Sequence, residues 1–341
     1  MYGIKEIREV LSNPPDNVNV VEMLIERDAL FKRTPYFYAE TLRDIELINK
    51  YPFDINHKEN NGKNALFYIK NKKVVLKLIE MGADVFAKNK KEQNLLFHCP
   101  DNMIELFMNN GLDINSCDSE GKTPLFYANV RRTEKMIKLG ADIHISDNFG
   151  NTALFFGSHL KKQFLIDNGA MINHINNLGC NALFNVEETD AAITLIQNGI
   201  DVNQISNAGK NALFVLREEV CRYLLESTKI NVNHINERDE KATALFGSGF
   251  NKSKLLIEYG INVNVKNHKE KNALFYTKKN KELIKLLIEH NCHVEEFLLS
   301  GKVNDQELID LMYLQRSGQS REILRNKIMC ENKDIVVQKR I

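Results

Sequence analysis

The sequence predicts an all-α fold, a solenoid of about nine short repeats, and three recurring features lead to that prediction. A phrase built on Leu-Phe recurs along most of the chain, an amphipathic stretch follows each copy, and a helix-ending signal comes next. The Phe residues of the phrase are 29 to 32 positions apart, and a period of this size marks a repeat architecture. The copies are TPYFYA (34–39), NALFY (64–68), NLLFH (94–98), TPLFYA (123–128), TALFF (152–156), NALFN (181–185), NALFV (211–215), TALFG (243–247) and NALFY (272–276).

The stretch after each phrase predicts a helix with one buried stripe. In residues 74–80 (VVLKLIE) and 282–289 (ELIKLLIE), apolar residues recur three and four positions apart. A glycine then follows in MGAD (81–84), LGAD (139–142) and NGID (198–201). Glycine suits the left-handed conformation that ends many helices, so each repeat is expected to contain a helix that stops there.

A short extended segment and a polar turn complete each repeat. The extended segment reads DIN at 113–115 and DVN at 201–203, and the turns read NNG, SEG, NFG and NAG. Asn, Asp and Gly supply the positive φ angles that such turns need, so we expect a short β-hairpin-like finger. The Asn or Thr that opens the next phrase is expected to cap the following helix.

Two helices followed by a finger make each unit resemble the ankyrin repeat. The family phrase T-P-L-H-x-A is matched best by Thr123–Ala128, with Phe126 in the place of the His, and the resemblance covers residues 34–295. The resemblance implies that protein partners are bound in a concave groove and by the finger loops. The resemblance also suggests that finger residues such as Asn115 or Asn203 are substrates for asparagine hydroxylation, which would be a modification and not an activity.

Two departures from the family change the expected packing. Every copy has Phe where the family has His, which predicts an apolar ladder in place of polar contacts. The unit has 29 or 30 residues in most copies, whereas the ankyrin unit has about 33. Because the spacing from the finger to the next phrase is nearly constant, we expect the missing helical turn to come from the junction between the two helices.

The repeats divide the chain into three parts. Residues 1–33 are expected to form N-terminal capping helices, 34–295 the repeat array, and 296–341 C-terminal capping helices and a tail. The flanking parts are too short for an added catalytic domain.

Composition narrows the class of protein. The net charge is +1, the six Cys are far apart in the sequence, and no apolar run is long enough to cross a bilayer. A reduced, cytoplasmic setting with no membrane partner is therefore expected, in the producing cell or an infected host. Abundant Lys, Asn and Ile without Trp is typical of AT-rich genomes, including those of phages, large viruses and intracellular bacteria.

No sequence motif indicates catalysis, a cofactor or a metal. Gly247-Ser248-Gly249 lacks the strand-turn-helix context of a nucleophile elbow. His290, Cys292 and His293 are close in sequence but lack a fourth ligand, which favours an exposed loop over a zinc site.

The residue after each Phe is the first candidate for partner binding. In ankyrin stacks this position faces the concave groove, and aromatic rows are good anchors for a protein partner. The alternative is that these rings only pack against the next repeat. The aromatic candidates are Tyr38, Tyr68, Tyr127, Phe156 and Tyr276.

The loops between the helices and one long finger are the second candidates. Charge is segregated along the loops, basic early, acidic in the middle and basic again late, which could steer a partner of complementary charge. The finger at 237–241 is two residues longer than the others, and a tolerated insertion is the alternative interpretation. The candidates are Lys72, Lys73, Arg131, Arg132, Glu187, Glu188, Glu237, Arg238, Asp239, Lys278 and Lys279.

The sequence thus favours a non-enzymatic protein-binding scaffold, one that sequesters or inhibits a host factor. The alternatives are the targeting part of an enzymatic effector and a nucleic-acid-binding module that uses the basic loops. The near-neutral charge and the acidic middle argue against nucleic acid. Self-association of the open stack into a homo-oligomer stays open.

Overall fold

The computed structural model describes residues 9–10, 12, 33–238, 241–302 and 305–316. Contacts divide the chain into two compact units, Met1–Met171 (unit 1) and Ile172–Ile341 (unit 2). The described residues are helical, with two isolated bridges, Ser146–Thr152 and Asn236–Ala242, in place of strands. The all-α prediction is confirmed, whereas the expected hairpin-like fingers contain no ladder of strand pairing in the part of the chain described.

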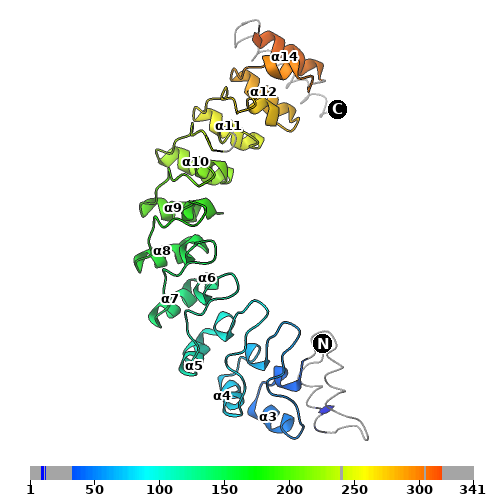
Figure 1. Ribbon diagram of the computed structural model, residues 1–341, viewed down its shortest axis with the longest axis vertical. Helices are drawn as coiled ribbons and strands as arrows, with labels where there is room; N and C mark the ends of the chain where they lie inside the picture. The colour runs from blue at the N-terminus through cyan, green and yellow to red at the C-terminus, as the bar shows by residue number, and fades with distance from the viewer. Residues whose placement is uncertain (1–8, 11, 13–32, 239–240, 303–304, 317–341) are drawn as a thin grey trace, which may run out of the picture. The chain divides into compact units, whose positions relative to one another are not determined.

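Unit 1 repeats a pair of helices, a 3₁₀ or short α turn followed by a longer helix (Figure 1). Its elements are η1 (Pro35–Tyr38), α3 (Leu42–Ile48), η2 (Ala65–Phe67), α4 (Lys72–Glu80), η3 (Leu95–Phe97), η4 (Asp101–Met103), α5 (Ile104–Asn109), α6 (Pro124–Tyr127), α7 (Val130–Lys138), η5 (Ala153–Phe155) and α8 (His159–Asp167). Helix α3 packs on α4, and α7 packs on α8.

Unit 2 continues the same pairing, except that the phrase at 243–247 forms a turn. Its elements are η6 (Ala182–Asn185), α9 (Thr189–Gln197), η7 (Ala212–Phe214), α10 (Glu218–Ser227), α11 (Phe250–Glu258), η8 (Ala273–Tyr276), α12 (Lys281–Glu289), α13 (Glu295–Leu299) and α14 (Gln306–Arg316). The longer helices contact one another in the order α9, α10, α11, α12 and α14. Of the predicted capping parts, 1–33 and 317–341 lie almost entirely outside the described residues.

The first helix of each repeat is much shorter than the second. In most repeats the Ala-Leu-Phe phrase forms a single 3₁₀ turn of three or four residues. A 3₁₀ turn is favoured in short pieces because its hydrogen bonds close over three residues. The sequence predicts a missing helical turn at the junction between the two helices, whereas the structure has a first helix of only one turn.

The Leu of the phrase is buried in every copy that has it. Leu66, Leu96, Leu154, Leu183 and Leu274 are each at most 2% exposed. The following Phe is less uniform: Phe37, Phe126 and Phe155 are buried and the others are half-buried. A buried Leu contributes about 1.5–3 kcal/mol. The Leu is therefore buried more completely than the Phe for which the apolar ladder was predicted.

The predicted helix stops have the expected backbone conformation. Gly82, Gly140 and Gly199 follow their helices with φ of 91°, 92° and 85°. Turn glycines have a second constraint, because a Cβ on Gly179 would lie 2.5 Å from the Asn207 side chain of the next finger. The finger turn is therefore set by both backbone conformation and the close approach of its neighbour.

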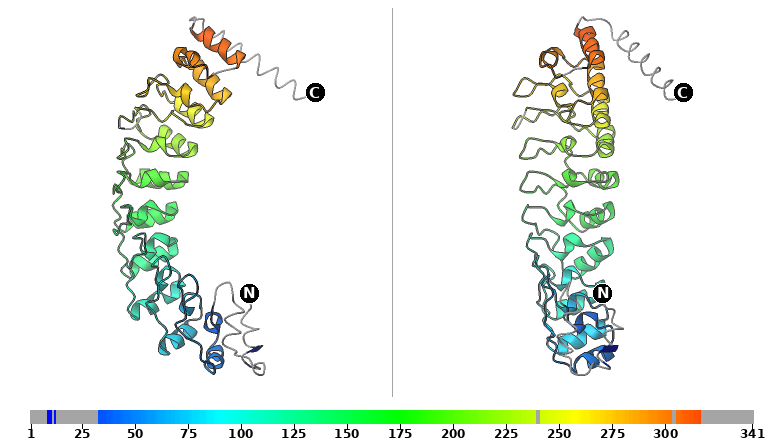
Figure 2. Two further views of the ribbon diagram at one scale, coloured as in Figure 1. Left: turned by 45° about the vertical axis from the view of Figure 1, so that its right-hand side comes forward. Right: turned by 90° about the vertical axis from the view of Figure 1, so that its right-hand side faces the viewer.

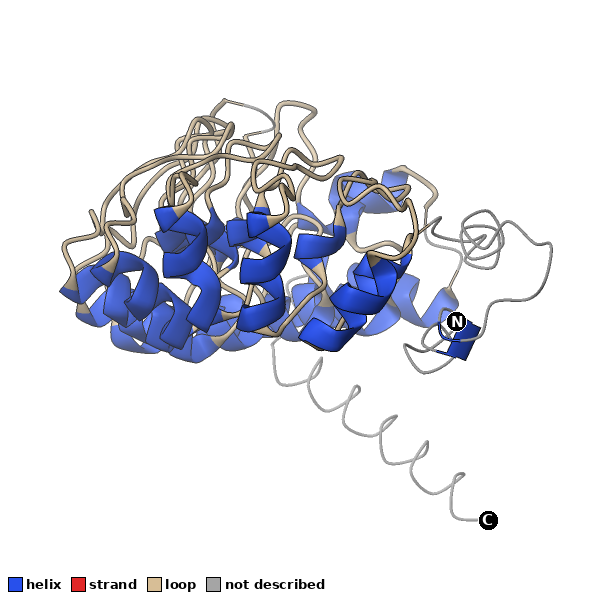
Figure 3. Cartoon of the chain, turned by 90° about the horizontal axis from the view of Figure 1, so that it is seen from below, coloured by secondary structure: helices blue, strands red, loops and turns tan. Residues whose placement is uncertain are grey.

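An Asn in most fingers ties that finger to the next one. In unit 2, Asn203 Nδ2 donates to Lys229 O at 3.2 Å, and its Oδ1 accepts from Asn231 N at 2.9 Å. Asn233 makes the same pair of bonds to Gly260 O and Asn262 N. Figures 2 and 3 show that the finger loops lie on one side of each unit and the longer helices on the other. These bonds therefore connect neighbouring repeats on the finger side.

Two lysines of α8 are buried without a carboxylate partner among the described residues. Lys161 Nζ donates to Leu125 O and Phe126 O, both at 2.9 Å, and Lys162 Nζ donates to Leu154 O at 2.7 Å. Both lysines are 1% exposed. Burial lowers the pKa of Lys161 to about 8, and burial followed by the charge of Lys161 lowers the pKa of Lys162 to about 7.

Replacing Asn203 with Ala is expected to lower the free energy of unfolding by about 1–2 kcal/mol, because two inter-repeat hydrogen bonds are lost. Urea unfolding measures the change. His144 occupies the same finger position with an exposed side chain, so His144→Ala is the matched control and should change stability by less than about 0.5 kcal/mol. Equal losses in both variants would contradict a bridging role for Asn203.

The buried lysines predict a stability that rises with pH. Between about pH 8 and 9.5 they are largely neutral when folded but charged when unfolded, where the ordinary pKa is about 10.4. The unfolded chain then binds more protons, so the free energy of unfolding increases by up to about 1.4 kcal/mol per pH unit for each lysine. Urea unfolding at several pH values should give a flatter profile for Lys161→Met/Lys162→Met than for the wild type. Parallel profiles would be evidence against buried neutral lysines.

Candidate functional site

Four of the five rings in the predicted aromatic row pack against the Phe of the preceding repeat. Ring centroids are 5.6 Å apart for Phe37 and Tyr68, and 5.9 Å apart for Phe97 and Tyr127. Phe126–Phe156 in unit 1 and Phe246–Tyr276 in unit 2 repeat this contact at 5.7 Å and 5.2 Å. Tilted aromatic pairs at such distances are favourable, so the row holds neighbouring repeats together.

A second contact fixes the tyrosine hydroxyls at the base of the finger. Tyr68 Oη donates to Glu59 Oε1 at 2.6 Å, and Tyr127 Oη donates to Asp118 Oδ2 at 2.8 Å. In unit 2, Asn267 Nδ2 donates to Tyr276 Oη at 2.5 Å. In each case the partner lies nine residues before the tyrosine. That fixed spacing is visible in the sequence, and it could have revealed the network.

At the start of unit 1, this contact becomes a buried charged cluster. The carboxylate of Glu59 is fully buried and accepts from the guanidinium of Arg33 at 3.0 Å. The same guanidinium lies 4.2 Å from the centre of the Tyr68 ring. Burial and then the hydrogen bond to Glu59 raise the pKa of Tyr68 to about 12, so its hydroxyl stays protonated. The half-buried Tyr38 also interacts with Arg33.

The cluster around Tyr127 extends into the preceding finger. Gln93 Nε2 donates to Asp118 Oδ2 at 3.0 Å, and His98 Nε2 lies 3.0 Å from Gln93 Oε1. Burial alone would raise the pKa of Asp118, but hydrogen bonds from Gln93 and Tyr127 lower it overall. Burial followed by the Asp118 hydrogen bond raises the pKa of Tyr127. The Tyr127 residue nevertheless remains 52% exposed, and its hydroxyl and ring are both held by contacts within the unit.

The basic loop candidates of unit 1 differ in accessibility. Lys72 and Lys73 are exposed in the first turn of α4, and Arg131 is exposed in α7. Arg132 is engaged internally, since its guanidinium donates to Leu96 O and Cys99 O at 2.7 Å and 2.6 Å and pairs with Asp101. We use the word frame for the buried residues and hydrogen bonds that hold neighbouring repeats together. Arg132 belongs to this frame, because it donates hydrogen bonds to carbonyl groups of the preceding repeat.

Unit 2 has the acidic loop and the long finger. Glu187 and Glu188 are exposed directly before α9, while Lys278 and Lys279 are exposed before α12. Glu237 and Arg238 are exposed in the long finger, and Arg238 donates to Asn207 O of the preceding finger at 3.0 Å. Asp239, the remaining candidate of this finger, lies outside the described residues.

Within the described ranges, the chain contains no cluster of three His, Cys, Asp or Glu side chains suited to a metal ion. Cys292 is buried rather than in an exposed loop, and burial raises the pKa of its thiol to about 12. Ser248 shares a hydrogen bond of 2.7 Å with Ser253 and has no His partner among the residues described. None of the helices in the described ranges is long and apolar enough to cross a membrane.

No protein-family model matches the chain, and no curated protein sequence matches it at a significant level.

Replacing Tyr68 with Phe should lower the free energy of unfolding by about 1–3 kcal/mol, because the buried Glu59 carboxylate loses a hydrogen bond. Thermal and urea unfolding measure the effect. The control is Tyr313→Phe, since Tyr313 is 55% exposed and has no hydrogen-bond partner among the described residues. If the two variants were equally stable, the hydroxyl of Tyr68 would have no role in the frame.

Proposed function

We propose that this chain is a non-enzymatic protein-binding scaffold built from shortened ankyrin-type repeats, and that unit 1 presents the main recognition surface. The repeat period, the glycine stops and the fingers on one side of each unit support this assignment. Such repeats use a common frame and leave surface positions free to vary. The aromatic row of unit 1 supports this division, since its rings contact the Phe of the preceding repeat on one side.

The exposed and immobilised ring of Tyr127 is the observation that carries the proposal. Asp118 holds its hydroxyl, and Phe97 lies against its ring. A ring fixed before binding loses little conformational entropy when a partner covers it, and tyrosines are frequent energetic anchors of protein interfaces. The fingers of unit 1 add two further exposed rings, Phe86 and Phe149.

The exposed basic side chains in the loops of unit 1 indicate a partner with an acidic surface. Lys72, Lys73 and Arg131 are exposed in unit 1 and have no ion-pair partner among the described residues. A protein surface with acidic side chains would complement these groups and associate faster at low salt. The amino-acid bias of AT-rich genomes supports a partner from a host cell, whose activity the scaffold would block by occupying its surface.

The test is affinity capture from host-cell lysate, with the full chain as bait in three versions: wild type, Tyr127→Ala and Tyr313→Ala. We expect a protein that binds the wild type to bind Tyr127→Ala about tenfold more weakly, as is usual when an anchor residue is removed. Tyr313→Ala removes an equally exposed tyrosine from α14 of unit 2 and should retain it. Circular dichroism melting verifies that each bait is folded.

Two outcomes would contradict the proposal. Retention of the same protein by all three baits would remove Tyr127 from the interface. Retention of nucleic acid with a steep salt dependence, and of no protein, would favour the nucleic-acid alternative instead.

A further inference from the structure

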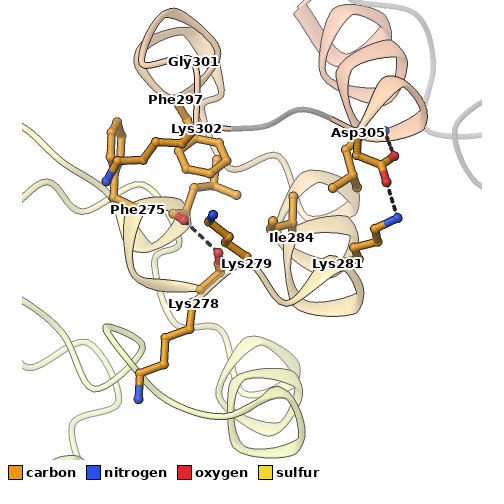
Figure 4. A pocket seen from close by; sticks show the side chains of 12 residues that line it. Phe275, Lys278, Lys279, Lys281, Ile284, Phe297, Gly301, Lys302 and Asp305 are labelled. Carbon is orange, nitrogen blue, oxygen red and sulfur yellow. Dashed lines mark hydrogen bonds and ion pairs between the residues drawn. The ribbon is translucent and has the colours of Figure 1, made fainter.

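A pocket of about 610 Å³ lies at the C-terminal end of the described part of unit 2. Figure 4 shows it between η8, the start of α12, α13 and the start of α14. Pockets for small organic ligands usually have volumes of about 300–1,000 Å³. The pocket therefore has the size of a ligand site, in a unit that contains few of the recognition residues proposed above.

The wall of the pocket is aromatic and aliphatic. The rings of Phe275 and Phe297 meet edge to face, with centroids 5.1 Å apart. Leu274, Ile284 and Leu308 add buried aliphatic side chains around them. Phe275 is half-buried, so part of its ring is accessible to a ligand. This wall suits the apolar body of a ligand.

Cationic groups surround this wall. Figure 4 shows the Lys279 side chain pointing into the pocket toward Phe297, whereas the Lys278 side chain points away from it. Lys302 Nζ lies 5.3 Å from the centre of the Phe275 ring. Lys281 is already paired with Asp305. Lys279 and Lys302 have no ion-pair partner among the described residues, so two ammonium groups remain available for an anion.

The loop that presents Lys279 differs from its counterparts in the other repeats. The N-cap Asn280 comes five residues after Phe275, whereas in the repeats of α3, α4 and α7 to α11 the N-cap comes three or four residues after the Phe. Lys278 and Lys279 both have positive φ, 51° and 65°. Two consecutive lysines in this conformation store strain of about 1–3 kcal/mol each, and such strain is concentrated at ligand-binding sites.

We propose that this pocket binds a small organic anion, one with a carboxylate, sulfonate or phosphate group on an aromatic or aliphatic body. The ammonium group of Lys279 or of Lys302 contacts the anionic group, and the rings of Phe275 and Phe297 contact the body. A cationic ligand is excluded because it would meet uncompensated like charges, and a neutral apolar one leaves both ammonium groups without a counter-charge. This site is independent of the protein interface proposed for unit 1.

The probe for the test is 8-anilinonaphthalene-1-sulfonate, which has an aromatic body and one sulfonate and fluoresces when bound in an apolar site. Titration of the full, folded chain should give saturable binding with one site per chain. Lys279→Gln should weaken binding by about tenfold, since a charge-assisted contact is lost. Lys278→Gln is the matched control, because it removes the same charge from the neighbouring residue whose side chain points away from the pocket. It should leave the affinity within about twofold.

A second probe separates charge from hydrophobicity. N-phenyl-1-naphthylamine has the same rings without the sulfonate, and it should bind at least about tenfold more weakly to the wild type. Lys302→Gln gives an independent reduction in sulfonate binding if Lys279→Gln is unfolded by circular dichroism. The proposal would be overturned if both probes bound equally well, or if lysine removal at 278 weakened sulfonate binding as much as removal at 279 or 302.

Discussion

The frame depends on contacts that each repeat makes with its neighbours, because one 3₁₀ turn and one short helix cannot bury their own apolar residues. Within unit 1, the rings at positions 68, 98, 127 and 156 lie against the Phe of the preceding repeat, as Tyr127 does against Phe97. On the finger side, Asn residues such as Asn203 join successive backbones in unit 2. These contacts recur at the repeat period, so the same residue types recur there, and the positions between them are free to differ.

The same tyrosines connect the frame to the proposed function. A tyrosine with a purely structural role would be buried. A tyrosine used only to bind another protein would make no contacts within its own chain. Tyr127 combines a fixed hydroxyl with an exposed ring. Tyr68, by contrast, is half-buried and closes a cluster with Arg33 and Glu59. One sequence position therefore serves mainly structure in one repeat and is available for binding in another.

The sequence predicted the features that depend on local pattern. The amphipathic helices, the glycine stops and the polar turns are all set by residue type and spacing. The sequence did not reveal which lysines and arginines are buried, because a charged residue in a helix is normally expected to be exposed to solvent. Aligning the second helices could have revealed them. Lys161 and Lys162 occupy the third and fourth positions after the N-cap, where α4 has Val74 and Val75.

The candidate site was predicted in part. The aromatic row was identified, but its hydroxyl partners depend on how the finger folds back, which is a tertiary contact. Arg132 resembles Arg131 in the sequence, and only the structure separates the exposed side chain from the one bonded to Leu96 and Cys99. The pocket near Lys279 is formed by α13 and α14 as well as the last repeat, so no single repeat indicates it.

Hydrogen exchange of the full chain, measured by mass spectrometry with and without the captured protein, tests the central claim most directly. That claim is that the rings and fingers of unit 1 recognise a partner while the longer helices support them. The account predicts slower exchange on binding in the peptides spanning 84–92, 118–128 and 147–151, with little change in α4 and α8. Protection confined to those helices, with the finger and tyrosine peptides unchanged, would contradict it.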